Sequence, residues 1–102
     1  AQDAQIKENA TEHLRALRVD EDVEHLQKAV TRFGERTGRL PASIAELASA
    51  EGLSGTPVDP DGHAYKLTPE GRVEIRVPDD FPFASKGLPP GYKPSPKYHA
   101  LQ

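Results

Sequence analysis

The sequence predicts a small α+β domain in which N-terminal amphipathic helices pack on a small antiparallel β-hairpin, followed by a Pro-rich C-terminal extension. Apolar residues recur with helical spacing in the first third of the chain, residues 72–77 alternate as strands do, and most Pro and Gly residues follow residue 38. A chain of 102 residues normally forms one domain with one modest core. We therefore expect a single domain over residues 1–80 and an extension over residues 81–102 that packs on it at least in part.

The first predicted helix covers residues 3–18. Its apolar residues recur at steps of four and three, which places them on one face. They are Ile6, Ala10, Leu14 and Leu17. A stripe this narrow cannot stabilise an isolated helix, so it needs a partner. We expect it either to pack on the next helix or to continue a segment that precedes this sequence.

The second predicted helix begins near Asp20, a residue suited to the N-cap, and ends at Gly38. Nothing between Arg18 and Glu21 forces a turn, so the alternative is one long helix. The strongest apolar stripe of the chain lies here and predicts the centre of the core. Its members are Val23, Leu26, Ala29, Val30 and Phe33.

A short third helix is predicted from Ile44 to about Ala50, with Ser43 as its cap and Glu46 at the third position of a capping box. Leu53 is expected to pack back on this helix. Strands are predicted over residues 64–67 and 72–77. In the second strand, three apolar residues for a buried face alternate with Arg72, Glu74 and Arg76 for a wet face. Two strands alone are only marginally stable, so we expect the hairpin to pack on the second helix.

The charge is unevenly distributed along the chain. All 16 acidic residues lie within residues 1–80, whereas residues 81–102 carry three Lys and no acidic residue. An acidic body argues against nucleic-acid binding, which needs a basic face. We expect the first part of the extension to lie across the body, anchored by Phe81 and Phe83, with extended polyproline II structure around its later prolines. The alternative after about Gly91 is a plain linker.

The sequence contains no recognisable catalytic constellation. Without Cys it has no thiolate nucleophile and no zinc–thiolate site. Its Ser residues lack the context of a nucleophile elbow. Its histidines have no metal-binding spacing, and they are His13, His25, His63 and His99. We therefore expect a protein that is not an enzyme and has no cofactor.

Calcium is the one metal for which the sequence offers candidate ligands. Asp59 and Asp61, followed by Gly62, look like part of a calcium loop, and Asp79 or Asp80 are further candidates. A calcium site needs six or more oxygen ligands, and the EF-hand pattern is incomplete here. The alternative is that Asp and Gly simply form the turn.

Two segments resemble motifs of the periplasmic domain of the major pseudopilin of type II secretion and its relatives. The first is FGERTGRLP (residues 33–41), with Gly38 and Pro41. The second is PVDPDGHAY (residues 57–65), whose matching residues are Pro57, Asp59, Pro60, Gly62 and Tyr65. In that family a long helix ends at the first motif, a short helix leads to the second, and a small antiparallel sheet packs on the long helix. The resemblance covers about residues 23–77.

The resemblance implies a pilin-like structural or assembly domain, located outside the bacterial cytoplasm and anchored in the membrane by an N-terminal segment that this sequence does not contain. Its partners would be other proteins or further copies. An alternative is a protein-interaction module of an uncharacterised membrane-anchored envelope protein. The chain departs from the family at Asp61, where the family has tryptophan. It also departs after Val77, where neither the family's C-terminal calcium loop nor its pattern continues.

Overall fold

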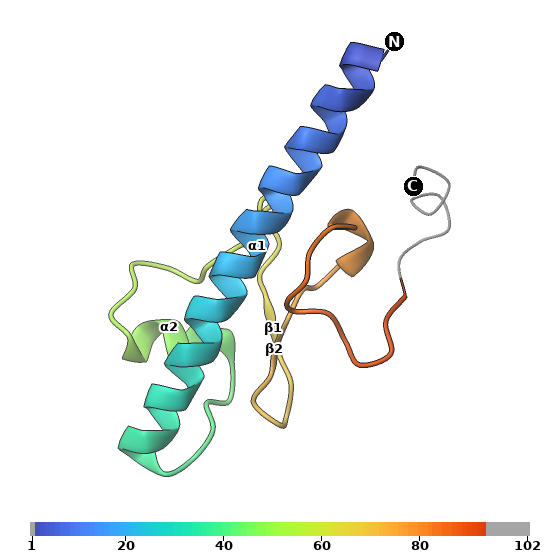
Figure 1. The fold of residues 1–102 in the computed structure, drawn as a ribbon. Coiled ribbons are helices and arrows are strands. Elements are labelled where there is room, and N and C mark those ends of the chain that lie inside the picture. The colour runs from blue at the N-terminus through green and yellow to red at the C-terminus, as the bar shows by residue number, and fades with distance from the viewer. Residues whose placement is uncertain (1, 94–102) are drawn as a thin grey trace.

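The computed structural model describes the backbone of residues 2–93 and the side chains of residues 10–93. Its elements in chain order are the helices α1 (Gln2–Thr37) and α2 (Ile44–Ala50), the strands β1 (Lys66–Leu67) and β2 (Val73–Glu74), and the 3-10 helix η1 (Pro78–Asp80). Figure 1 shows α1 as one long rod whose first turns extend beyond the other elements. The α+β class is therefore as predicted.

The two helices predicted on either side of Asp20 are a single helix. Asp20 is not an N-cap, because its carboxylate binds residues 85–86 and not the backbone of α1. It accepts hydrogen bonds from the Ser85 hydroxyl (2.8 Å) and from the backbone N–H groups of Ser85 and Lys86 (both 3.0 Å). The helix ends as predicted at Gly38, whose φ of 76° is readily adopted only by glycine.

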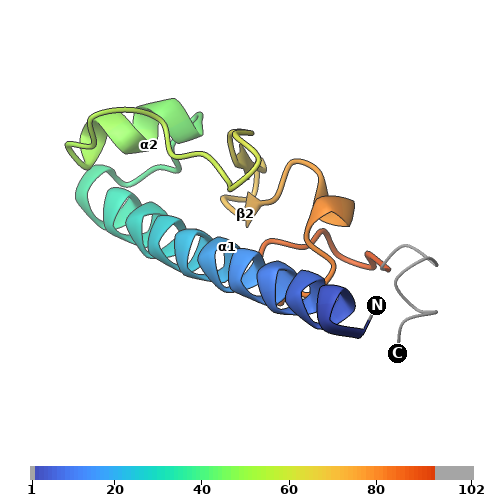
Figure 2. The same ribbon diagram turned by 90° about the horizontal axis from the view of Figure 1, so that it is seen from above.

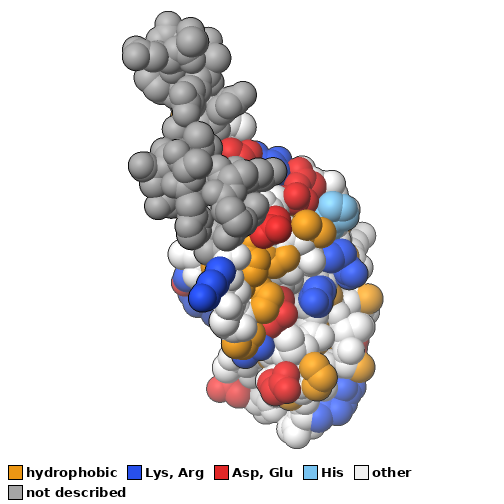
Figure 3. Space-filling model, turned by 90° about the vertical axis from the view of Figure 1, so that its right-hand side faces the viewer, with side chains coloured by type: hydrophobic (Ala, Val, Ile, Leu, Met, Phe, Trp, Pro, Cys, Tyr) orange, Lys and Arg blue, Asp and Glu red, His pale blue; other side chains and the backbone are white. Residues whose placement is uncertain are grey.

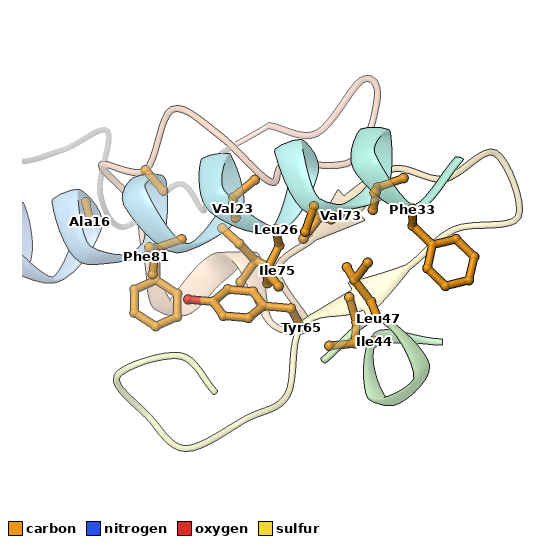
Figure 4. Packing of buried hydrophobic residues seen from close by; sticks show 14 residues of the cluster. Ala16, Val23, Leu26, Phe33, Ile44, Leu47, Tyr65, Val73, Ile75 and Phe81 are labelled. Atoms are coloured by element: carbon orange, nitrogen blue, oxygen red, sulfur yellow. The ribbon is translucent and has the colours of Figure 1, made fainter. Parts of the chain in front are cut away.

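The two apolar stripes of α1 differ in burial. The stripe of the C-terminal half forms the core, as predicted, and Val23, Leu26, Ala29, Val30 and Phe33 are all buried. Figure 4 shows several of these side chains pointing into the cluster. By contrast, Leu14 and Leu17 are 67% and 56% exposed, so the expectation that their stripe packs on a following helix is wrong. Ala16 and Val19 continue the buried face instead, and the side chain of Ile6 lies outside the described residues.

The helix α2 packs its apolar face against α1. Ser43 caps it as predicted, since its hydroxyl accepts from the Glu46 N–H at 3.0 Å. Ile44, Leu47 and Ala48 are buried, and Figure 4 shows Ile44 and Leu47 on the side that faces α1. Leu53 folds back on the end of α2, where its N–H donates to the carbonyl of Ala48 (2.9 Å), and its side chain is 47% exposed.

The hairpin is antiparallel, with Lys66 opposite Glu74 and Leu67 opposite Val73. Its strands are shorter than predicted. The carbonyl of Ala64 accepts from the side chain of Arg76 (3.1 Å) and Ala64 forms a bridge with Val58, so the pairing of the two strands does not continue to Ala64. Glu74, predicted for the wet face, is buried and accepts from Arg72 at 2.9 Å. Figure 2 shows α2 and the hairpin on the same side of α1.

The outer edge of β2 is covered by two different groups. The side-chain amide of Gln27 donates to the carbonyl of Gly71 (2.8 Å) and accepts from the N–H of Val73 (3.0 Å). The N–H of Ile75 then donates to the carbonyl of Gly87 (2.7 Å). A Gln side chain therefore takes the place of a neighbouring strand.

We call residues 81–88 the strap. Phe81 is 1% exposed and, with Ala84, belongs to the core cluster. Phe83 stacks on His13 with ring centroids 4.1 Å apart. Figure 3 views the side of the molecule where this part of the chain lies, and shows hydrophobic side chains interspersed with charged ones. The later prolines, from Pro94 onwards, lie outside the described residues.

Candidate functional site

The second motif forms a closed turn, which we call the Asp turn (residues 57–65). The carboxylate of Asp59 accepts from the N–H groups of Asp61 (2.8 Å) and His63 (3.1 Å). The backbone of Asp59 also donates to the carbonyl of His63 (2.8 Å) and accepts from Gly62 (2.9 Å). Gly62 has a φ of 88°, which explains the need for glycine. Asp59 therefore acts as an Asx-turn residue that holds the loop shut.

Two side-chain contacts hold the Asp turn on α1. Arg15 donates to Asp61 at 2.8 Å. The hydroxyl of Tyr65 donates to Asp22 at 2.7 Å, and its ring is 2% exposed. Arg15 and Asp22 are two helical turns apart and so lie on one face of α1. The turn is thus fixed to the helix at its centre and at its C-terminal end.

The electrostatics of the Asp turn follow from these contacts. The hydrogen bond from Arg15 lowers the pKa of Asp61 and raises the pKa of Arg15 itself. Burial, reinforced by the hydrogen bond between the two carboxyl groups, raises the pKa of Asp80 beside Asp61. Burial and the hydrogen bond to Asp22 raise the pKa of Tyr65, so this phenol stays a neutral donor.

One oxygen of the Asp turn stands out. The side chain of Asp59 is fully buried, and its Oδ2 has no hydrogen-bond partner among the described residues. The nearest cationic candidate is Nδ1 of His63, at 4.0 Å. A buried polar atom without a hydrogen bond lowers the stability of the fold, so Oδ2 of Asp59 is expected to destabilise a turn whose other polar groups are hydrogen-bonded.

The calcium ligands predicted from the sequence are already engaged with protein groups. Asp59 binds backbone N–H groups, Asp61 binds Arg15, and Asp79 accepts from the Tyr92 hydroxyl. Within residues 10–93, no three His, Asp or Glu side chains come together in a way that could hold a metal ion. Calcium binding at Asp59 and Asp61 stays an untested alternative to their role in forming the turn.

The first motif connects α1 to α2. Pro41 is buried, and the guanidinium of Arg39 lies 5.0 Å from the ring centroid of Phe33. Arg39 also pairs with Glu46 at 2.8 Å. This hydrogen bond, together with one from the N–H of Ala42, lowers the pKa of Glu46 to about 2. Glu46 bonds to Ala42 and not to Ser43, which differs from the predicted capping box.

Sequence reasoning missed the α1 residues that receive the loops. Asp20, Asp22 and Gln27 each bind a segment more than 40 residues away. Each flanks the buried stripe of α1, and that position is the one available signal. A polar residue beside a buried face is common on any amphipathic helix, so the signal does not identify the partner.

Comparison with known proteins yields no relative: no family model matches the chain, and neither a curated protein nor a solved structure is significantly similar to it. Within residues 2–93, neither helix combines the length and the apolar composition that a membrane span needs.

Proposed function

We propose that this chain is a non-enzymatic assembly domain located outside the bacterial cytoplasm, the pseudopilin-like head of a secretion or filament component. The observation that carries the proposal is the shape of the molecule. A helix of 36 residues carries the hairpin, α2 and the strap on one part of its length, while its first turns extend beyond these elements. A helical stem with a small head suits subunits that pack side by side through their stems.

The surface of α1 supports the same proposal. Leu14 and Leu17 are exposed on the side of the helix opposite the core. Exposed apolar residues on a projecting helix suit lateral contacts with neighbouring subunits. In this proposal the stem continues into a membrane anchor that precedes residue 1.

The polar groups of the Asp turn also fit a structural role. Asp61 and Tyr65 bind α1 directly, so the most distinctive motif of the sequence is used to fix the head to its stem.

The proposal is tested by cysteine cross-linking of the full-length protein in the cells that produce it. The chain contains no Cys, so Leu17→Cys introduces a single reactive site within it. Thr31 is exposed as well, but it lies on the part of α1 that carries the head, so Thr31→Cys serves as the matched control. We expect oxidation to give a disulfide-linked homodimer with Leu17→Cys only, because one introduced Cys can join no more than two subunits.

A second function is favoured by the same exposed leucines, which would equally suit contact with a different protein. The chain would then be a protein-interaction module of a membrane-anchored envelope protein. A disulfide between Leu17→Cys and a cysteine of one other protein, without the homodimer, would support this function. Accumulation of the protein in the cytoplasm, or no cross-link at all, would contradict both.

A further inference from the structure

The two edges of the hairpin are not equivalent. Gln27 and Gly87 cover the edge of β2. Between the two strands, the N–H of Thr68 donates to the carbonyl of Arg72, so Thr68 and Arg72 form a hydrogen-bonded pair. Bonded and non-bonded pairs alternate along antiparallel strands, so the next pair, Leu67 and Val73, is non-bonded. This alternation turns the N–H and C=O of Leu67 away from β2. Neither group has a backbone partner among the described residues, so β1 presents an open edge at Leu67, directly after the bridge between Ala64 and Val58.

A groove runs along this open edge. It has a volume of about 400 Å³ and lies between β1 and the start of α2. Its walls come from Ser43 and Ile44 on one side and from Lys66 and Leu67 on the other, with Thr56 and Arg76 also contributing. An extended chain placed here would form hydrogen bonds with β1 and contact the first turn of α2.

The charge of the groove identifies the kind of chain that fits it. Almost every Arg and Lys within residues 10–93 has a carboxylate within 4.0 Å. The exceptions in this part of the chain are Lys66, Arg76 and Lys93, and two of these three line the groove. No acidic residue lines it. In a chain with a net charge of −3, two unpaired cations at one groove are a specific feature.

We propose that the β1 groove binds an extended acidic segment of a partner protein, which adds to the sheet as a third strand. Backbone hydrogen bonds to Leu67 would fix its direction, and its carboxylates would pair with Lys66 and Arg76. The added strand also gives the hairpin the third strand that small sheets need for stability. This inference does not depend on the function proposed above.

The probe for the test is a capped hexapeptide of alternating Val and Glu, titrated into the isotope-labelled chain and followed by NMR. We expect saturable shifts at the amides of Lys66, Leu67 and residues 42–45, with a Kd of about 0.1–1 mM because few groups are in contact. The same peptide with Lys in place of Glu should not bind. A peptide N-methylated on alternate residues, which keeps its charge but loses strand hydrogen bonds, should bind at least about tenfold more weakly.

Charge reversal in the protein gives the matching control. Combined Lys66→Glu and Arg76→Glu should weaken binding at least about tenfold. Lys93→Glu makes the same change of sign at the unpaired cation outside the groove and should leave binding unchanged. Undiminished binding of the N-methylated peptide, shifts away from β1, or equal binding to the charge-reversed protein with intact spectra would overturn the proposal.

Discussion

Tyr65 connects the Asp turn to α1 through a single hydroxyl group. Tyr65→Phe removes the bond to Asp22 and leaves the ring in place, so we expect a loss of about 1–3 kcal/mol in the free energy of unfolding. Urea denaturation measures this change. In a double-mutant cycle, Asp22→Ala should cost much less in the Tyr65→Phe background than in the wild type. Fully additive effects of the two substitutions would contradict the direct contact.

The calcium prediction for Asp59 and Asp61 is tested by a thermal melt in millimolar calcium against the same sample in EDTA. Selective binding at a hundred times the Kd would add about 2.7 kcal/mol, a shift of several degrees. We expect no shift, because Arg15 and two backbone N–H groups already occupy these carboxylates. A calcium-dependent rise that Asp61→Asn abolishes would establish the metal site.

At the scale of the element, α1 combines a buried and an exposed apolar face. Phe33 is 3% exposed, so Phe33→Ala should cost about 3–5 kcal/mol. Leu17 is 56% exposed, so Leu17→Ala should change the stability by no more than about 0.5 kcal/mol. Thermal melts of the two variants make the comparison. Coincident melts of Phe33→Ala and the wild type would reject the core position of Phe33.

The strap offers a second pair of matched variants. Gly87 has a φ of 79°, and a Cβ there would lie 2.8 Å from Val23 Cγ2 and 3.0 Å from Ile75 Cγ1. Gly87→Ala should therefore cost at least about 1–3 kcal/mol through strain and overpacking. Gly55 has open space around its Cα and no positive φ, so Gly55→Ala should be neutral or stabilising by up to about 1 kcal/mol. Chemical denaturation measures the stability of both variants. Equal stabilities of Gly87→Ala and Gly55→Ala would contradict the close packing of the strap against Val23 and Ile75.

Local patterns predicted the elements better than their partners. The spacing of Val23, Leu26, Val30 and Phe33 identifies a core face because burial follows helical periodicity. The same spacing at Leu14 and Leu17 looks alike in the sequence, yet nothing in the described structure covers them. Periodicity shows which residues share a face and does not show what lies opposite it.

Long-range polar contacts were the least predictable part of the fold. Asp is a residue type that often caps helices, but the side chain of Asp20 binds the strap 65 residues away. Gln27 has no sequence signature at all and yet covers the edge of β2. For the Asp turn, in contrast, the residues Asp59 and Gly62 were identifiable because the geometry of a turn depends on its own residues.

At the scale of the whole molecule, ion pairs make stability depend on pH. The hydrogen bond from Arg39 lowers the pKa of Glu46 from 4.5 to about 2, and ion pairs also lower the pKa values of Glu51 and Asp61. Groups with a depressed pKa stabilise the fold above their unfolded pKa and lose this contribution as the pH falls through the folded one. Asp80 acts in the opposite sense because its pKa is raised.

We therefore expect the unfolding free energy to fall as the pH is lowered from about 4.5 to about 2, since depressed carboxyl groups outnumber the raised one. Urea denaturation at a series of pH values measures this slope. Glu46→Gln removes one of the titrating groups and should make the slope shallower. An unchanged slope in that variant would show that the Arg39 pair does not persist in solution.

The amide of Gln27 also limits how the sheet can grow. Because this amide occupies Gly71 and Val73, the described part of the chain leaves the hairpin with one free edge, and only one further strand can add to it. Two copies that met at this edge would saturate each other, and no further chain could join them by the same contact. The domain can thus reach high local concentrations without templating the open-ended stacks that amyloid growth requires.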